Sequence, residues 1–227
     1  MHFKELQKQI YDFLEAKRVE SYSLADKHFK LPLSDAIFCA QDAFRNRKFY
    51  EATSMAIADL KKEHESIVVV DAGSGTGVLG LFALLSGADK CYFLEHNPYA
   101  LSLSKEFMGH FELLNKCEFI ECDATSMALP EKFDLLISET ISAGFLDEDF
   151  PGIVRNLKDH EKEHAIYIPQ SFEIIISGNE PIFQKTPDEI QKISAQPGST
   201  ISMSAQLYND VWIRPAESAS FLNERKV

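Results

Sequence analysis

The chain has 227 residues, of which 45% are hydrophobic and 26% are charged, and its formal net charge is −12. This composition is typical of a globular protein and excludes a disordered one. The acidic excess lies beyond residue 64, because residues 1–64 carry a net charge of +1 and residues 65–227 a net charge of −13. Nucleic-acid affinity depends largely on Lys and Arg neutralising phosphates, so nonspecific DNA binding is not expected.

The chain shows no pattern of a disulfide-rich, metal-binding or membrane-spanning protein. Its cysteines are Cys39, Cys91, Cys117 and Cys122. They form no C-x-x-C pair, so neither a disulfide framework nor a zinc site is predicted, and we expect no metal. The N-terminal residues lack the apolar segment of a signal peptide, and no run approaches the roughly 18 apolar residues of a membrane span. These features predict a reduced, cytoplasmic protein.

The first 64 residues predict a helical cap. Apolar residues from Phe3 to Leu14 recur at three- and four-residue steps, which predicts an amphipathic helix. A second helical stretch covers residues 34–62 without Pro or Gly, and we expect it to bend near residues 45–48. Both helices precede the first predicted strand, so residues 1–64 form the first predicted domain.

From residue 66 onward, predicted strands alternate with predicted helices. Strands are expected at residues 66–71, 91–95, 117–120 and 133–137, and helices at residues 78–86, 98–111 and 149–157. This alternation predicts an α/β fold with a parallel, Rossmann-like sheet over residues 65–170.

After a polar turn at 158–164 the pattern changes. Two strands, at 165–168 and 172–177, follow without an intervening helix, and a short helix is expected near 188–193. Residues 171–227 therefore form a third predicted domain, a small β-rich C-terminal extension.

The strongest local signal is the glycine-rich loop that follows the first of these strands. Gly73, Gly75 and Gly77 allow a sharp turn and close approach to a ligand at the carboxyl end of the strand. Gly75-x-Gly77-x-x-Gly80 matches the dinucleotide fingerprint. However, Asp71 ends the strand two residues before the first glycine, where its carboxylate would repel a pyrophosphate. A ligand that carries an ammonium or a sulfonium group tolerates this acid better.

The sequence Asp-x-Gly-x-Gly-x-Gly resembles motif I of the class I S-adenosylmethionine (SAM) methyltransferases. This resemblance implies that SAM is the cofactor. It further implies that Glu95, at the end of the second strand, binds the ribose hydroxyls. Asp123, followed by Ala124, stands where that family contacts the adenine amino group. The resemblance places the following residues in the cofactor-binding loop: Asp71, Gly73, Ser74, Gly75, Thr76 and Gly77.

A more specific resemblance, to the protein arginine methyltransferases, covers residues 34–173. Ser138-Glu139 ends the fourth strand and Glu148 follows nine residues later, as in that family's pair of glutamates, which clamps a guanidinium. Paired carboxylates suit the planar donor fork of a guanidinium. Asp42-x-x-Arg45 resembles the family's Asp-x-x-Arg, in which the Arg pairs with the methionyl carboxylate of the cofactor. The resemblance thus implies that Glu139 and Glu148 are catalytic.

The chain also departs from that family. Thr140-Ile-Ser-Ala143 replaces its Trp-Met-Gly-Tyr segment, so we expect the aromatic packing of this loop to be lost, and its Thr-His-Trp segment is absent. Only 55 residues follow Phe172, fewer than a full barrel and dimerisation arm require. For Glu148 the sequence leaves a second role open, at the N-terminus of the helix near residue 149, where the helix dipole favours acids.

These observations predict a SAM-dependent methyltransferase that acts on a nitrogen or oxygen acceptor, with an arginine-like or other cationic group as one candidate. Two alternatives stay open: a catalytically inactive SAM-binding subunit and a nicotinamide-dependent oxidoreductase. The acidic balance favours a cationic peptide or small molecule as the acceptor over nucleic acid, with RNA as the less favoured alternative. No membrane partner is expected, and a homodimer is left open.

Overall fold

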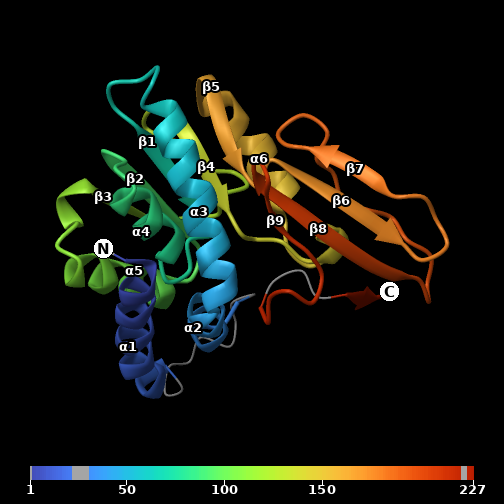
Figure 1. Ribbon diagram of the computed structural model, residues 1–227, viewed down its shortest axis with the longest axis horizontal. Helices are drawn as coiled ribbons and strands as arrows, with labels where there is room; N and C mark the ends of the chain where they lie inside the picture. Colours follow the sequence, from blue (N-terminus) through green and yellow to red (C-terminus); the bar gives the residue numbers. More distant parts are fainter. Residues whose placement is uncertain (1, 22–30, 221–223) are drawn as a thin grey trace.

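The computed structural model describes residues 2–21, 31–220 and 224–227. Its described part contains a parallel and an antiparallel sheet, and Figure 1 shows the antiparallel sheet extending to one side of the parallel one. The α-helices are α1 (Phe3–Ser21), α2 (Leu33–Gln41), α3 (Ala43–Leu60), α4 (Val78–Leu85), α5 (Pro98–His110) and α6 (Phe150–Leu157). Short 3₁₀ turns lie at η1 (Leu114–Lys116), η2 (Ala143–Phe145) and η3 (Lys158–His160).

The parallel sheet has the strand order β3-β2-β1-β4-β5. Its strands are β1 (Val68–Ala72), β2 (Lys90–Glu95), β3 (Cys117–Glu121), β4 (Phe133–Ser138) and β5 (Glu161–Ile168). Every residue of β1 and β4 is buried, as expected for central strands that are covered on both faces. The prediction of a Rossmann-like α/β sheet is therefore confirmed. The carboxyl ends of β1, β2 and β4 meet at one edge, where such sheets bind their ligands.

The N-terminal cap differs from its prediction in one respect. Residues 34–62 are not one helix with a bend near 45–48, because the chain breaks earlier, at Asp42, into α2 and α3. Asp42 leaves helical geometry (φ −67°, ψ 100°), and its side chain accepts a hydrogen bond from the backbone N–H of Arg45. It is thus the N-cap of α3, a position that Asp favours because its side chain satisfies a free amide of the first turn.

The antiparallel sheet has the order β10-β8-β6-β7, and β9 pairs with β8. Its strands are β6 (Ser171–Ile176), β7 (Ile182–Lys185), β8 (Thr200–Tyr208), β9 (Val211–Ile213) and β10 (Arg225–Lys226). The helix expected near residues 188–193 is wrong, since this segment forms turns and irregular chain. The predicted turn at 158–164 is shorter than expected, because β5 begins at Glu161. The three domain boundaries stay a prediction.

The antiparallel sheet packs against α3, the helix that also packs against α4 and β4. Alternate residues of β6, such as Phe172 and Ile174, are fully buried, as are Ile201 and Ala205 on β8. The hydroxyl of Tyr208 at the end of β8 donates to the Asp59 carboxylate of α3 over 2.9 Å. One helix, α3, therefore contacts both sheets and couples them.

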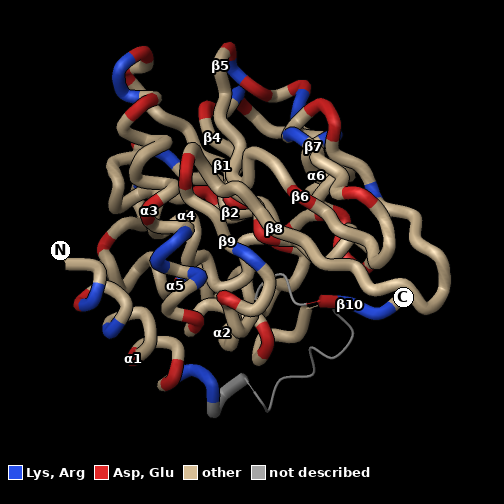
Figure 2. The backbone as a smooth tube through the Cα atoms, turned by 45° about the vertical axis from the view of Figure 1, so that its right-hand side comes forward, with Lys and Arg blue, Asp and Glu red and all other residues tan. Residues whose placement is uncertain are grey.

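Charges of both signs lie along α1 in Figure 2, in keeping with the nearly neutral N-terminal region. Among the helices that the structure describes, none combines the length and the apolar character that crossing a membrane requires.

Two helical glycines provide a test of how tightly α4 packs on the sheet. A Cβ atom added at Gly80 would lie 2.3 Å from Cε1 of Phe93, whereas one added at Gly109 of α5 would meet Leu114 at an ordinary 3.5 Å. We expect Gly80→Ala to lower the free energy of unfolding by about 1–3 kcal/mol through overpacking. The matched Gly109→Ala should leave it unchanged or raise it by about 0.5–1 kcal/mol. Denaturant unfolding of both variants measures the difference, and equal effects would contradict this packing.

Candidate active site

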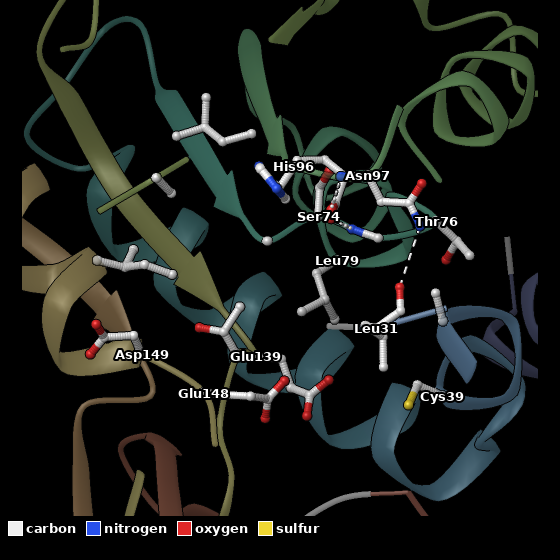
Figure 3. A pocket seen from close by; sticks show the side chains of 18 of the residues that line it. Leu31, Cys39, Ser74, Thr76, Leu79, His96, Asn97, Glu139, Glu148 and Asp149 are labelled. Atoms are coloured by element: carbon white, nitrogen blue, oxygen red, sulfur yellow. Dashed lines mark hydrogen bonds between the residues drawn. The ribbon is translucent and has the colours of Figure 1, made fainter. Parts of the chain in front are cut away.

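A cavity of about 310 Å³ lies at the carboxyl edge of the parallel sheet. Its floor is the loop after β1, its sides are the segments after β2, β3 and β4, and residues of α2 complete it (Figure 3). Eight of the ten residues predicted from the sequence to bind the cofactor line it: Arg45, Gly73, Ser74, Gly75, Thr76, Glu95, Asp123 and Ala124. Both predicted catalytic glutamates, Glu139 and Glu148, line it as well. The fold thus brings together residues that are 103 positions apart in the chain, from Arg45 to Glu148.

The glycine loop holds its shape through backbone conformations that favour glycine. Gly73 and Gly75 have φ values of 69° and 53°, in the left-handed region that side chains disfavour. A Cβ at Gly73 would also lie 2.2 Å from Cγ2 of Thr140, which follows β4. The amides of Gly73 and Ser74 donate to the carbonyl of Leu94 on β2 over 2.8 and 3.0 Å. The loop is therefore fixed against both neighbouring strands before any ligand binds.

Glu95 is held by the same loop. One of its carboxylate oxygens accepts the amide of Gly75 over 2.7 Å, and the other accepts the amide of Asn97 over 2.8 Å. A carboxylate oxygen accepts more than one hydrogen bond, so Glu95 retains acceptor capacity toward the cavity. Asp123, across the cavity edge, receives the amide and the hydroxyl of Thr125 over 2.9 and 2.6 Å. Both acids are thus preorganised at the ends of successive strands.

Asp71 and Gly77 do not line the cavity, contrary to the sequence interpretation. The Asp71 side chain is 1% exposed and accepts the amide of Gly80, in the first turn of α4, over 2.8 Å. It therefore lies beneath the loop rather than facing a ligand. Burial raises the pKa of Asp71 to about 8, although the hydrogen bond from the Gly80 amide favours the charged form and opposes this shift. Gly77 is the N-cap of α4 and packs against Ser104 and Phe93.

Arg45 joins the helical cap to the end of β4. It is 4% exposed, and its Nη2 donates to a carboxylate oxygen of Glu139 over 2.5 Å. Its Nη1 donates to Asn46 over 3.1 Å, and its guanidinium lies 5.1 Å from the ring centroid of Phe49. Burial raises the pKa of Glu139 above its ordinary value, and the ion pair with Arg45 opposes that shift.

Two buried polar atoms of the cavity have no hydrogen-bond partner among the residues that the structure describes. They are Nε of Arg45 and Oγ of Ser74. A buried donor without a partner costs free energy, and such atoms at a cavity wall indicate a polar ligand. Arg45 is therefore suited to bind a ligand carboxylate through Nε while its terminal nitrogens remain engaged.

Glu148 lies in the loop between β4 and α6. The sequence left two roles open for it, a catalytic glutamate and an acid at the N-terminus of α6. Asp149, not Glu148, is the N-cap of α6, and its carboxylate accepts the amide of Gly152 over 3.2 Å. Figure 3 shows Glu148 and Glu139 at the same end of the cavity. The loop is anchored by the Ser142 hydroxyl, which accepts the amides of Asp147 and Glu148 over 2.9 and 3.3 Å.

Aromatic packing supports this loop, contrary to the expectation that it is lost. Phe145 is fully buried and stacks against Phe150 of α6, with ring centroids 5.9 Å apart. It also meets Phe172 of β6 edge-on at 5.0 Å. Residues 140–143 contain no aromatic side chain, and the aromatic residue that packs here, Phe145, stands two positions after Ala143. The loop that carries Glu148 therefore rests on the antiparallel sheet.

Several lining residues were not identified as site residues from the sequence. Ala36, Cys39 and Ala40 share one face of α2 at helical spacing, and His96 and Asn97 follow Glu95 directly. The α2 residues carry no motif; only their three- and four-residue spacing beside Asp42-x-x-Arg45 could have indicated them. Burial, then the charge of Glu139, raises the pKa of the Cys39 thiol to about 12, so the thiol stays neutral. No group of metal-ligating side chains occurs among the described residues.

The buried Asp71 predicts a specific pH dependence of stability. The native state keeps this carboxyl protonated up to about pH 8, whereas the unfolded chain loses the proton at about pH 4. The stabilising contribution of Asp71 is therefore complete below about pH 4 and is lost as the pH rises through about 8. Asn cannot ionise, so the variant Asp71→Asn does not lose this contribution. The free energy of unfolding of Asp71→Asn minus that of wild type should therefore be larger at about pH 9 than at about pH 5. Urea unfolding at both pH values measures this gain, with Asp210→Asn, in an exposed turn, as the charge control. A difference that stays constant with pH would contradict a buried, protonated Asp71.

Comparison with known proteins agrees with this geometry. A family model described as "Methyltransferase small domain" matches residues 36–140. A probable histone-arginine methyltransferase CARM1 from rice (Oryza sativa subsp. indica) is 32% identical over 108 residues, which make up 48% of this chain and 20% of that protein. Protein arginine N-methyltransferase 7 from Danio rerio is 29% identical over 136 residues, 57% of this chain and 20% of that protein. The chain thus spans about a fifth of the length of these relatives.

Solved structures with the same fold include two arginine methyltransferases. The Trypanosoma brucei PRMT1 enzyme–prozyme heterotetramer with AdoHcy has a TM-score of 0.54 and 22% identity, over 61% of this chain and 42% of that chain. Protein arginine methyltransferase 10 from Arabidopsis thaliana has a TM-score of 0.53 and 22% identity, over 61% of this chain and 38% of that chain. In its fold, its family model and its relatives the chain thus resembles a class I SAM-dependent methyltransferase domain, similar to those of the arginine methyltransferases.

Proposed function

We propose that this protein transfers a methyl group from SAM to a guanidine nitrogen of an arginine or an arginine-like cationic acceptor. The observation that carries the proposal is that Glu139 and Glu148 line the same cavity as the glycine loop, Glu95 and Asp123. A donor site and a pair of carboxylates that suits a guanidinium thus share one chamber.

The lining residues fit SAM in charge and in polarity. Glu95 and Asp123 offer acceptors for hydroxyl and amino groups, and Nε of Arg45 offers a donor for a carboxylate. SAM supplies an electrophilic methyl group on a sulfonium and leaves as S-adenosylhomocysteine. Carboxylates around the cavity favour this cation, whereas the buried Asp71 occupies a first-turn amide of α4 and disfavours a pyrophosphate there. An oxidoreductase is therefore not favoured.

Glu139 and Glu148 would orient the acceptor and keep one of its nitrogens nucleophilic. Two carboxylates on a guanidinium localise its positive charge away from the attacking nitrogen, and they hold that nitrogen in line with the methyl group. The attacking nitrogen loses one proton as the new carbon–nitrogen bond forms, and these carboxylates are the nearest acidic groups of the cavity to receive it. The burial that raises the pKa of Glu139 makes it a better proton acceptor.

Both glutamates are present at the cavity, which supports an active enzyme over an inactive SAM-binding subunit. The acceptor enters a site whose charged lining residues are acidic apart from Arg45, which favours a cationic peptide or small molecule and disfavours RNA. A homodimer is an assembly compatible with the proposal. The absence of a membrane-crossing helix among the described residues bears on none of these points.

Cofactor choice is the first test of this proposal. S-adenosylhomocysteine should raise the melting temperature of the protein, and NAD should not, because only a ligand that binds the native state stabilises it. Gly75→Arg should abolish the shift, since Gly75 lines the cavity at a φ of 53°. Circular dichroism of this variant confirms that it is folded. A shift with NAD alone would favour the oxidoreductase.

The glutamate pair is the second test. In a methyl-transfer assay with an arginine-containing peptide, Glu139→Gln and Glu148→Gln should each lower the rate by about a hundredfold or more, because an amide neither accepts the proton nor matches the charge of a guanidinium. Asp147→Asn is the control, because Asp147 is an exposed acid beside Glu148 that lies outside the cavity lining. Equal rates for Glu139→Gln, Glu148→Gln and Asp147→Asn would remove the glutamate pair from the mechanism.

A further inference from the structure

Residues 214–220, after β9, return to the helical cap and contact Asp42. The Ser218 hydroxyl donates to Oδ2 of Asp42 over 2.7 Å. The hydroxyl and the backbone amide of Ser220 donate to the same oxygen over 3.0 and 3.1 Å. The other oxygen, Oδ1, accepts the amide of Arg45 over 3.0 Å. One carboxylate thus receives four hydrogen bonds from two segments more than 170 positions apart.

Within residues 214–220, hydrogen bonds to Asp42 are the contacts that join the segment to the helical cap. Arg214, Ala216 and Glu217 are exposed, whereas Ser218 is 4% exposed. A buried serine in an exposed turn needs a partner for its hydroxyl, and Asp42 is that partner. Hydrogen bonds to an ionised acceptor are stronger than those between neutral groups. The contact is therefore specific to these donors.

Asp42 connects this segment to the cofactor cavity. It is the N-cap of α3, and Arg45 stands in the first turn that it caps. Although burial disfavours the charged form, the hydrogen bonds from Arg45, Ser218 and Ser220 lower the pKa of Asp42 below its ordinary value. Asp42 thereby stays a carboxylate near Arg45 and fixes the direction in which α3 starts. That direction decides where the Arg45 guanidinium meets the cavity.

No residue beyond Ile153 lines the cavity within the described chain, so the C-terminal segment can affect the cavity only through other residues. We propose that Ser218 and Ser220 are positioning residues of the cofactor site, which hold Asp42 and through it Arg45. This inference rests on the proposed function, because it assigns Arg45 to the cofactor. The C-terminal part of the chain then supports the site in two places. Phe172 of β6 packs against the loop of Glu148, and the segment after β9 holds Asp42 and through it Arg45.

The test compares S-adenosylhomocysteine binding by calorimetry in wild type, in Ser218→Ala/Ser220→Ala, and in Ser202→Ala. Ser202 lies in β8 of the same sheet, away from Asp42. The double variant loses two hydroxyl hydrogen bonds to the Asp42 carboxylate and should bind roughly tenfold more weakly, because this loss acts on the ligand only through Arg45. The control variant should bind as wild type does. In turnover, the KM for SAM should rise by a larger factor than kcat falls, because Ser218 and Ser220 reach the catalytic Glu139 only through Asp42 and Arg45.

Single variants cover the case in which the double variant is unstable. Ser220→Ala should weaken binding by about threefold, because the Ser220 amide still donates to Asp42. Ser220→Thr keeps the hydroxyl and should restore wild-type binding. All measurements are made well below each melting temperature, so that folding does not limit binding.

The outcomes separate this inference from the proposed function. If wild type does not bind S-adenosylhomocysteine, the proposed function fails. If wild type binds and the double variant binds equally tightly, the positioning role is overturned, whether or not the melting temperature falls. A lower melting temperature with unchanged affinity would show that Ser218 and Ser220 only fasten the C-terminal segment.

Discussion

The site depends on an ion pair between two parts of the chain that lie 94 positions apart in the sequence. Arg45 belongs to the helical cap and Glu139 to the end of β4, and their contact closes the cavity between them. The Arg45 side chain is buried and the Glu139 side chain is 14% exposed. Removing such ions from water costs free energy unless hydrogen bonds and geometry compensate. Asn46, Phe49 and Glu139 compensate Arg45, and Nε remains for a ligand. The pair therefore joins the helical cap to the end of β4 and leaves Nε of Arg45 without a partner among the described residues, which supports the proposed role in binding the cofactor.

The surrounding structure constrains each partner of that pair. On the helical side, Asp42 caps α3 and is itself held by the C-terminal segment. On the sheet side, Thr140 occupies the space that a Cβ at Gly73 would need, which ties the end of β4 to the glycine loop. The antiparallel sheet contributes no lining residue among those described, yet it supports both sides. We infer that it positions the candidate active site rather than extending it.

Local sequence patterns predicted those features that depend on local chemistry. The continuous β-branched run of β1 and the glycines after it predicted the parallel sheet and the cavity floor. A central strand is covered on both faces and so needs apolar residues, and a sharp loop with positive φ needs glycine. Strand-end acids could be placed for the same reason. The direction of the Asp71 side chain could not, since a carboxylate at a strand end can face either the ligand or the first turn of the next helix. The contact of Ser218 with Asp42 joins distant segments without a motif, so no local pattern predicts it.

The most direct test of this account is the identity of the methylated atom. The protein is incubated with SAM and two peptides that differ only in Arg or Lys at one position, and mass spectrometry locates the added methyl group. The account predicts a methyl group on a guanidine nitrogen of the Arg peptide and none on the Lys peptide, because paired carboxylates match the planar guanidinium fork and not a single ammonium. Methylation of the Lys peptide alone, or binding of SAM without transfer to the Arg peptide, would contradict it.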